Sequence, residues 1–219
     1  MKRNVVWLAV FAIAMALLEA AVVIYLRSLY YPGNILKIFP PKILAHLDLV
    51  LEISREAATI VMLLGVAVLA ERGFLRVFAA FVYGFGLWDI FYYVWLKVFI
   101  GWPVHWGGWD ILFLIPWAWL GPWIAAVMVA TIFVVWGGAV LSLPGSFRVS
   151  TSNVLIFTVG TALVLTSFLQ PAFGLLGRGE QALADYRPGG FWWGAYASGL
   201  VLMAAALART FLDGRRRVL

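Results

Sequence analysis

The chain has 219 residues, of which 64% are hydrophobic and only 12% are charged, and its mean hydropathy is +0.98. This composition excludes a soluble globular protein and is typical of a polytopic membrane protein. The absence of cysteine excludes disulfides, thiolate nucleophiles and cysteine-ligated metal centres. The net charge of +6 forms no basic stripe with interleaved aromatic residues, so we expect no nucleic-acid partner.

Apolar stretches of about 20 residues are long enough to cross a bilayer as helices. Taken in chain order, they predict an all-α, polytopic integral membrane protein, in which residues 1–219 form a single transmembrane domain with short loops. The first stretch ends before the turn signal at 31–34, and the third ends at Gly101-Trp102-Pro103. We expect six transmembrane helices at about 4–26, 43–70, 74–100, 122–141, 154–176 and 191–212.

The fourth hydrophobic stretch, residues 110–141, is too long for one upright span. As a straight helix it would extend about 48 Å. Pro116 and Pro122 both interrupt it, and proline removes a helical hydrogen bond and clashes with the preceding turn. We therefore expect a broken fourth helix, with a half-helix or re-entrant segment at 111–120 that precedes the span.

The distribution of Lys and Arg predicts the orientation of the chain. With six spans, nine of these residues fall on the side of the termini and six on the opposite side. Basic residues near the ends of spans are retained preferentially in the cytoplasm. We therefore expect a protein of the cell (inner) membrane of a prokaryote, in contact with the lipid bilayer and with both termini in the cytoplasm.

Acidic residues inside the apolar stretches are the most informative feature of the sequence. Glu19 lies in the first predicted span, Glu52 and Glu56 in the second, and Asp89 in the third, while Asp110 opens the fourth. At 1.5 Å per residue, all fall near the middle or in the outer half of the bilayer, Glu19 and Asp89 at about 22 Å from the cytoplasmic face. A carboxylate at such depth is costly and commonly marks a functional pocket or path.

The spacing of these residues places several of them on common helix faces. Asp48, Glu52 and Glu56 recur every four residues, and Asp89 and Tyr93 do the same in the third span. One pocket can therefore collect side chains from several spans. We predict a ligand- or proton-binding site formed by Glu19, Glu52, Arg55, Glu56, Asp89 and Asp110, with Arg27, Tyr93, Lys97 and Gln170 in supporting positions.

Acids outnumber bases in this predicted pocket. Six acids, Asp48 included, accompany the three bases Arg27, Arg55 and Lys97, so three acids remain if every base pairs with one acid. Surplus buried acids must bind a cation, hold a proton or reach water. The structural alternative is an ion network around Arg55 that only fixes the packing of the helices.

A metal site is a further alternative, although the sequence requires no cofactor. A carboxylate-bridged di-metal centre needs about four carboxylates and two histidines, and the chain has enough of both. The Glu-x-x-His spacing that builds such centres is missing. If a metal binds, its ligands are expected among Glu19, Glu52, Glu56, Asp89 and His46.

Tryptophan is abundant, with twelve residues, and most of them map near the outer boundary of the membrane. An aromatic belt at the interface accounts for this pattern. The other interpretation is a stacking surface for a partner subunit or an apolar ligand. The residues of this Trp-rich outer rim are Trp95, Trp102, Trp106, Trp109, Trp117, Trp119, Trp192 and Trp193.

No P-loop, dinucleotide fingerprint, nucleophile elbow or zinc-protease motif occurs in the chain, so the sequence favours a role other than an enzyme. We expect a membrane protein that uses its anionic pocket to bind or transport a cation, a proton or a small amphipathic molecule. The first alternative is a non-catalytic subunit of a larger membrane complex. The second is an intramembrane enzyme that acts on a lipid or quinone, with carboxylates as general acid and base.

Overall fold

The computed structural model describes residues 2–143, 149–175, 182 and 185–215. Within these residues, six helices are long and apolar enough to cross a membrane, which confirms the prediction of six such helices. Their ends differ from the predicted spans by no more than four residues. The helices are α1 (Lys2–Tyr30), α2 (His46–Ala70), α3 (Phe74–Ile100), α4 (Trp123–Ser142), α5 (Thr151–Phe173) and α7 (Trp193–Arg215).

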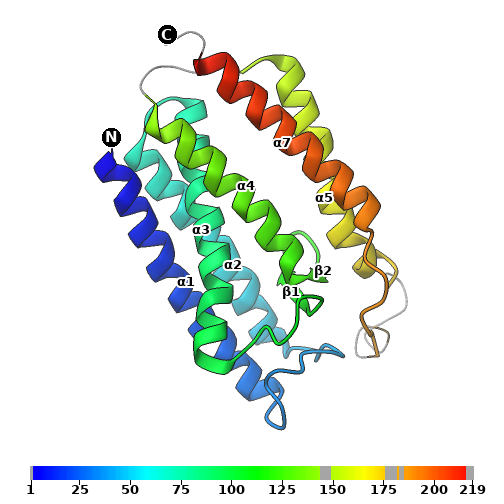
Figure 1. The fold of residues 1–219 in the computed structure, drawn as a ribbon. Coiled ribbons are helices and arrows are strands. Elements are labelled where there is room, and N and C mark those ends of the chain that lie inside the picture. The colour runs from blue at the N-terminus through cyan, green and yellow to red at the C-terminus, as the bar shows by residue number, and fades with distance from the viewer. Residues whose placement is uncertain (1, 144–148, 176–181, 183–184, 216–219) are drawn as a thin grey trace.

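The helices run along a common direction, and α1 begins at the same end of the bundle at which α7 ends (Figure 1). Helix α3 packs against α1, α2 and α4, whereas α5 packs mainly against α7. The α5–α7 pair meets the other helices mainly through α4 and through the segment that precedes α4, and Phe157 of α5 also contacts Phe78 of α3. The loop at 31–45 lies at the end of the bundle opposite to the first residue of α1 (Figure 1).

Glycine allows the closest approaches between helices. A Cβ atom on Gly86 of α3 would lie 2.6 Å from a backbone oxygen of α4, and one on Gly137 of α4 would lie 2.6 Å from a backbone oxygen of α3. Gly160 and Gly199 face each other between α5 and α7 with the same crowding. Small residues at helix contacts let backbones pack closely where apolar burial supplies little driving force. The two helix pairs are therefore fixed by backbone contact.

The segment at 111–120 lies in a β-hairpin, so the predicted half-helix is wrong. Strand β1 (Trp109–Phe113) pairs antiparallel with β2 (Trp119–Pro122). Pro116 lies in the connection between the strands, where no helical hydrogen bond is required of it. Helix α4 begins only at Trp123, after the second strand. Aromatic and β-branched residues favour strands, and the hairpin satisfies backbone groups that a proline-interrupted helix would leave unpaired.

Aromatic packing fixes the hairpin on the α5 side. Trp119 of β2 stacks on Phe168 of α5, with ring centroids 6.3 Å apart and planes 14° apart. Trp109 of β1 meets Phe191 edge to face. The neighbouring Leu120 is buried with 1% of its surface exposed. The hairpin is thus held between the α5–α7 pair and the first three helices (Figure 1).

Candidate functional site

A cavity of about 470 Å³ lies between α1, α2, α3, the β-hairpin and the loop at 31–45. Its wall is formed by apolar and aromatic side chains with a group of charged ones among them. Side chains that are far apart in the sequence, on α1, α2, α3 and β1, meet there. The predicted site residues that line it are Glu19, Arg27, Glu52, Arg55, Glu56, Asp89, Tyr93 and Asp110.

Two of the residues predicted in supporting positions lie elsewhere. Lys97 donates hydrogen bonds from Nζ to the carbonyl oxygens of Gly101 and Pro103, at 3.0 and 2.8 Å. Its long side chain therefore reaches the polar end of α3 instead of the cavity. Gln170 belongs to α5, which packs on the side of the hairpin away from α2, and it does not line the cavity. Neither residue therefore belongs to the group of side chains that lines the cavity.

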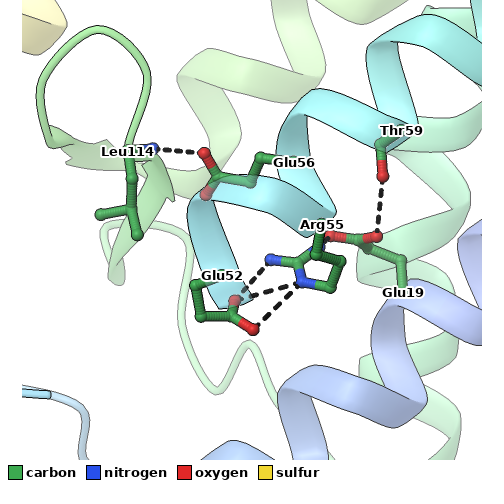
Figure 2. Close-up of polar contacts among 6 residues, drawn as sticks. All are labelled: Glu19, Glu52, Arg55, Glu56, Thr59 and Leu114. Carbon is green, nitrogen blue, oxygen red and sulfur yellow. Dashed lines mark hydrogen bonds and ion pairs between the residues drawn. The ribbon is translucent and has the colours of Figure 1, made fainter. Parts of the chain in front are cut away.

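Arg55 joins two helices through two carboxylates (Figure 2). It forms an ion pair with Glu19 of α1, and its Nη2 lies 2.6 Å from Oε2 of Glu52, one turn earlier in α2. Its Nε donates to both oxygens of Glu52, at 3.2 and 3.1 Å. The Thr59 hydroxyl donates to Glu19 at 3.4 Å. One guanidinium group therefore contacts two carboxylates and can neutralise the charge of only one of them.

A second ion pair, between Arg27 and Asp110, connects α1 to β1. Nη2 of Arg27 lies 3.3 Å from Oδ1 of Asp110, and the two side chains are 5% and 3% exposed. The hydroxyl of Tyr93 and the amide N–H of Ile111 donate to the carboxylate, at 3.3 and 3.0 Å. The Arg27 guanidinium lies over the ring of Trp102, 4.1 Å from its centroid. Burial raises the pKa of Asp110, and the charge of Arg27 opposes this rise.

Two further carboxyl groups have no cation within hydrogen-bonding distance among the residues that the structure describes. Glu56 is 5% exposed and accepts a hydrogen bond of 2.8 Å from the backbone N–H of Leu114 in the hairpin. Figure 2 shows its side chain directed toward the hairpin, away from the carboxylates that Arg55 binds. Asp89 lines the cavity and forms no hydrogen bond or ion pair within the part of the chain that the structure describes.

The surplus of acids predicted from the sequence is present in the cavity wall. Five carboxyl groups share the wall with two guanidinium groups and the ammonium group of Lys42, which leaves two negative charges in excess if all of these groups are ionised and His46 is neutral. The exposed side chains of Lys42 and His46 also line the cavity, at its end near the loop. Asp48, the sixth acid of the predicted set, does not line it and is bound by the hydroxyl of Tyr30. The uncompensated charge therefore falls on the deeper part of the wall.

The arrangement offers no multidentate metal site in the described ranges. No three His, Asp or Glu side chains among these residues are placed to hold one ion, and this includes the five residues proposed above as metal ligands. The carboxyl groups are instead distributed along the cavity wall. Such an arrangement suits groups that need one or two carboxylates each, such as a proton or an organic cation.

Apart from Tyr93, the aromatic residues of the cavity were not predicted from the sequence. Trp88 and Tyr92 of α3, Tyr30 of α1 and Phe113 of β1 all line it. Tyr92 could have been found, because it lies three residues after Asp89 and therefore on the same helix face. Trp88 is only adjacent to Asp89, and adjacent positions do not share a helix face. The Leu114 N–H could not have been found, because it depends on the hairpin.

The hydrogen bond between Glu56 and the Leu114 N–H predicts a local effect on the hairpin. Because a bond to a charged acceptor contributes more than a neutral one, Glu56→Ala is expected to increase amide exchange at Leu114 by about tenfold or more. Glu56→Gln keeps an acceptor oxygen and should give a smaller increase. Hydrogen exchange measured by mass spectrometry tests this, with Asp213→Ala as a control at an exposed position of α7. Equal exchange in all variants would contradict the contact.

The geometry thus defines a cavity with an acidic and aromatic wall, and its chemistry has to be inferred from the residues themselves. Comparisons of the chain with protein-family models, with curated proteins and with solved structures gave no match.

Proposed function

We propose that the protein is an integral protein of the cell (inner) membrane with both termini in the cytoplasm. The six apolar helices support this placement, because each is long enough to cross the hydrocarbon layer. The even number of helices agrees with α1 beginning and α7 ending at one end of the bundle (Figure 1). Under this proposal, the cavity and the hairpin belong to the outer half of the bilayer.

The cavity binds or transports a cation, a proton or a small amphipathic molecule. The observation that supports this function is the pair Glu56 and Asp89, two carboxyl groups in the cavity wall that have no cationic partner at hydrogen-bonding distance in the described part of the chain. An uncompensated charge in a weakly polar environment is costly unless a ligand or a proton neutralises it. Arg55 then adjusts the charge of the site through Glu19 and Glu52.

The β-hairpin is the moving or ligand-facing element of this proposal. Non-helical backbone at membrane depth is tolerated where it is buried in protein or lines a cavity, and discontinuous segments of this kind form ligand sites in transporters. The hairpin supplies Asp110, Ile111 and Leu114 to the wall. Its contact with Glu56 links the charge state of the cavity to the position of the hairpin.

Titration of the purified protein tests the proposed function. Because uncompensated carboxylates in the wall destabilise the fold, thermal stability is expected to fall as the pH rises from about 5 to about 9. A ligand cation should restore the melting temperature at the upper end of this range. Asp89→Asn and Glu56→Gln should each flatten the dependence, because they remove one titrating charge. The measurement is a set of melting curves at several pH values, combined with proton release on cation addition.

Asp213→Asn provides the matched control, because it makes the same chemical change at an exposed position of α7 outside the cavity. Its profile should follow that of the unmodified protein. If the Asp89 and Glu56 variants also follow that profile and cations release no protons, the carboxyl groups serve packing alone and the proposed function is excluded.

The second candidate function is that of a subunit of a larger complex, and exposed tryptophans favour it. Trp106 is 74% exposed, and Trp192, Trp193 and Trp117 are 43–49% exposed. Other members of the predicted rim are internal, since Trp102 is 4% exposed and stacks under Arg27. The mass of the detergent-extracted protein separates the two functions. A stable, cooperatively unfolding monomer or homodimer argues against an obligate subunit.

A further inference from the structure

The unpaired groups of the cavity point to a class of ligand. Asp89 and Glu56 can each bind a positively charged group, while Nη1 of Arg27 is a donor without a hydrogen-bond partner among the described residues. Resting on the proposed function, we propose that the cavity binds an amphipathic organic amine, protonated at nitrogen and carrying a neutral hydrogen-bond-accepting oxygen close to that nitrogen.

Asp89 and Glu56 favour an ammonium group over a metal ion. A Ca²⁺ or Mg²⁺ site needs about six oxygen ligands in a compact arrangement. The described residues contain no group of three acids or histidines placed around one point. An ammonium group is satisfied by one or two carboxylates and by aromatic faces. Trp88 and Tyr92, which flank Asp89 on α3 and line the cavity, supply such faces.

Arg27 provides the second, independent observation. The residue is only 4% exposed and lines the cavity, and its Nη2 binds Asp110. Its Nη1 is buried without a hydrogen-bond partner within the described part of the chain. A buried donor left unsatisfied costs free energy, which a ligand oxygen recovers on binding. A neutral oxygen suits this position, because the charge of Arg27 is already balanced by Asp110.

The size and lining of the cavity indicate the size and polarity of the rest of the ligand. A volume of about 470 Å³ falls in the range of sites for small organic molecules and far exceeds the need of a hydrated ion. Side chains such as Val23, Leu26 and Leu49 give much of the wall an apolar surface. An apolar body of one or two rings, or a short alkyl chain, is therefore expected beside the amine.

Three fluorescent naphthyl probes test this inference with the full chain in a non-ionic maltoside detergent. The first is propranolol, which has a naphthyl ring, a protonated amine and two oxygens, one in an ether and one in a hydroxyl group. The second is the corresponding naphthyloxy-propanediol, in which a hydroxyl replaces the amine. The third is a naphthylalkyl amine that lacks both oxygens. Saturable binding is measured by equilibrium dialysis, with protein-free micelles subtracted.

The expected result is saturable binding of propranolol, with the diol at least about tenfold weaker because it lacks the charge. Asp89→Asn should weaken propranolol about tenfold and leave the diol unchanged, whereas Asp213→Asn should change neither. Arg27→Lys keeps the pair with Asp110 but removes the free guanidinium donor. It should therefore reduce the preference for propranolol over the oxygen-free amine.

Equal binding of amine and diol by the unmodified protein would overturn the inference without the use of any variant. So would equal losses in Asp89→Asn and Asp213→Asn, or the absence of saturable amine binding. If the pH and cation titration still depends on Asp89 or Glu56, the proposed function stands and only the amine class fails. If that titration is also flat, both are excluded.

Discussion

Replacing Arg27 by methionine is expected to lower the free energy of unfolding by about 3–5 kcal/mol. Methionine is an apolar side chain of similar length, but the substitution leaves Asp110 buried without its cation. The side chains of Arg27 and Asp110 are only 5% and 3% exposed. It also removes the guanidinium that lies over Trp102. Reversible unfolding in mixed detergent micelles, followed by the fluorescence of the tryptophans, gives the measurement.

The double variant Arg27→Met/Asp110→Asn separates the buried charge from the loss of packing. It removes both charges, so it is expected to recover at least half of the loss, whereas Arg187→Met, at an exposed position before α7, should be neutral. A loss below about 1 kcal/mol for Arg27→Met, or a double variant as unstable as the single one, would show that the pair is effectively solvated.

Alanine at Gly86 or Gly137 is expected to cost about 1–3 kcal/mol each. The added methyl group would lie 2.6 Å from a backbone oxygen of the facing helix in both cases, a contact that forces α3 and α4 apart. Because α3 also carries Asp89 and packs against α1, the separation should disturb the cavity as well. Unfolding free energy and the affinity for any cavity ligand are the two quantities to measure.

Gly65→Ala is the matched control, because Gly65 lies in the apolar helix α2 and nothing stands within 4 Å of its added Cβ position. Alanine has the higher helix propensity, so this variant should be neutral or slightly stabilising. If Gly86→Ala and Gly137→Ala behave like Gly65→Ala, the helices can separate at little cost, and close backbone packing does not fix the α3–α4 pair.

The two ion pairs have different consequences for the proposed function. The network of Arg55 with Glu19 and Glu52 is half-buried and joins α1 to α2, a helix pair with little other contact. It suits a connection that adjusts as the charge in the cavity changes. The pair of Arg27 and Asp110 is deeply buried and holds β1 against α1. On the side of α1 and α2, the hairpin therefore has a firm attachment at β1 and a charge-dependent attachment at Leu114, in addition to its aromatic packing on the α5 side.

In the proposed function, binding of a cation or proton at Glu56 would act directly on the hydrogen bond that this residue accepts from the hairpin. A carboxylate that becomes neutralised is a weaker acceptor, so its hydrogen bond to the Leu114 N–H loses strength. The connection between the strands is then less firmly held, while β1 remains fixed through Asp110. In the proposed function, the position of the hairpin therefore differs between an occupied and an empty cavity.

The helices and the acidic character of the site were accessible from the sequence. Uninterrupted apolar length identifies a helix that can cross a membrane without knowledge of its neighbours, because its backbone is satisfied within the segment. An acid inside such a stretch is conspicuous by itself. Glu19, Glu52, Glu56 and Asp89 could therefore be selected before any packing was known, and the cavity brings them together with Asp110.

Only the tertiary structure decided how these groups are paired. The sequence alone indicated that Arg55 would meet an acid, and the spacing of three residues favours Glu52 over Glu56, but the contact with Glu19 depends on how α1 and α2 are rotated toward each other. Lys97 shares a helix face with Asp89, yet its flexible side chain binds carbonyl groups at the end of α3 instead. Helical spacing gives a direction around the axis, and a long side chain can leave it.

The hairpin shows the same limit for secondary structure. Residues 111–120 are apolar and interrupted by Pro116, a pattern that fits a short half-helix as well as a strand pair. The strands form because their backbone groups pair with each other and because Trp119 finds Phe168 of α5, about fifty residues later in the chain. Short apolar segments take the conformation that their distant neighbours stabilise, whereas long apolar helices satisfy their own hydrogen bonds and so could be predicted from the sequence alone.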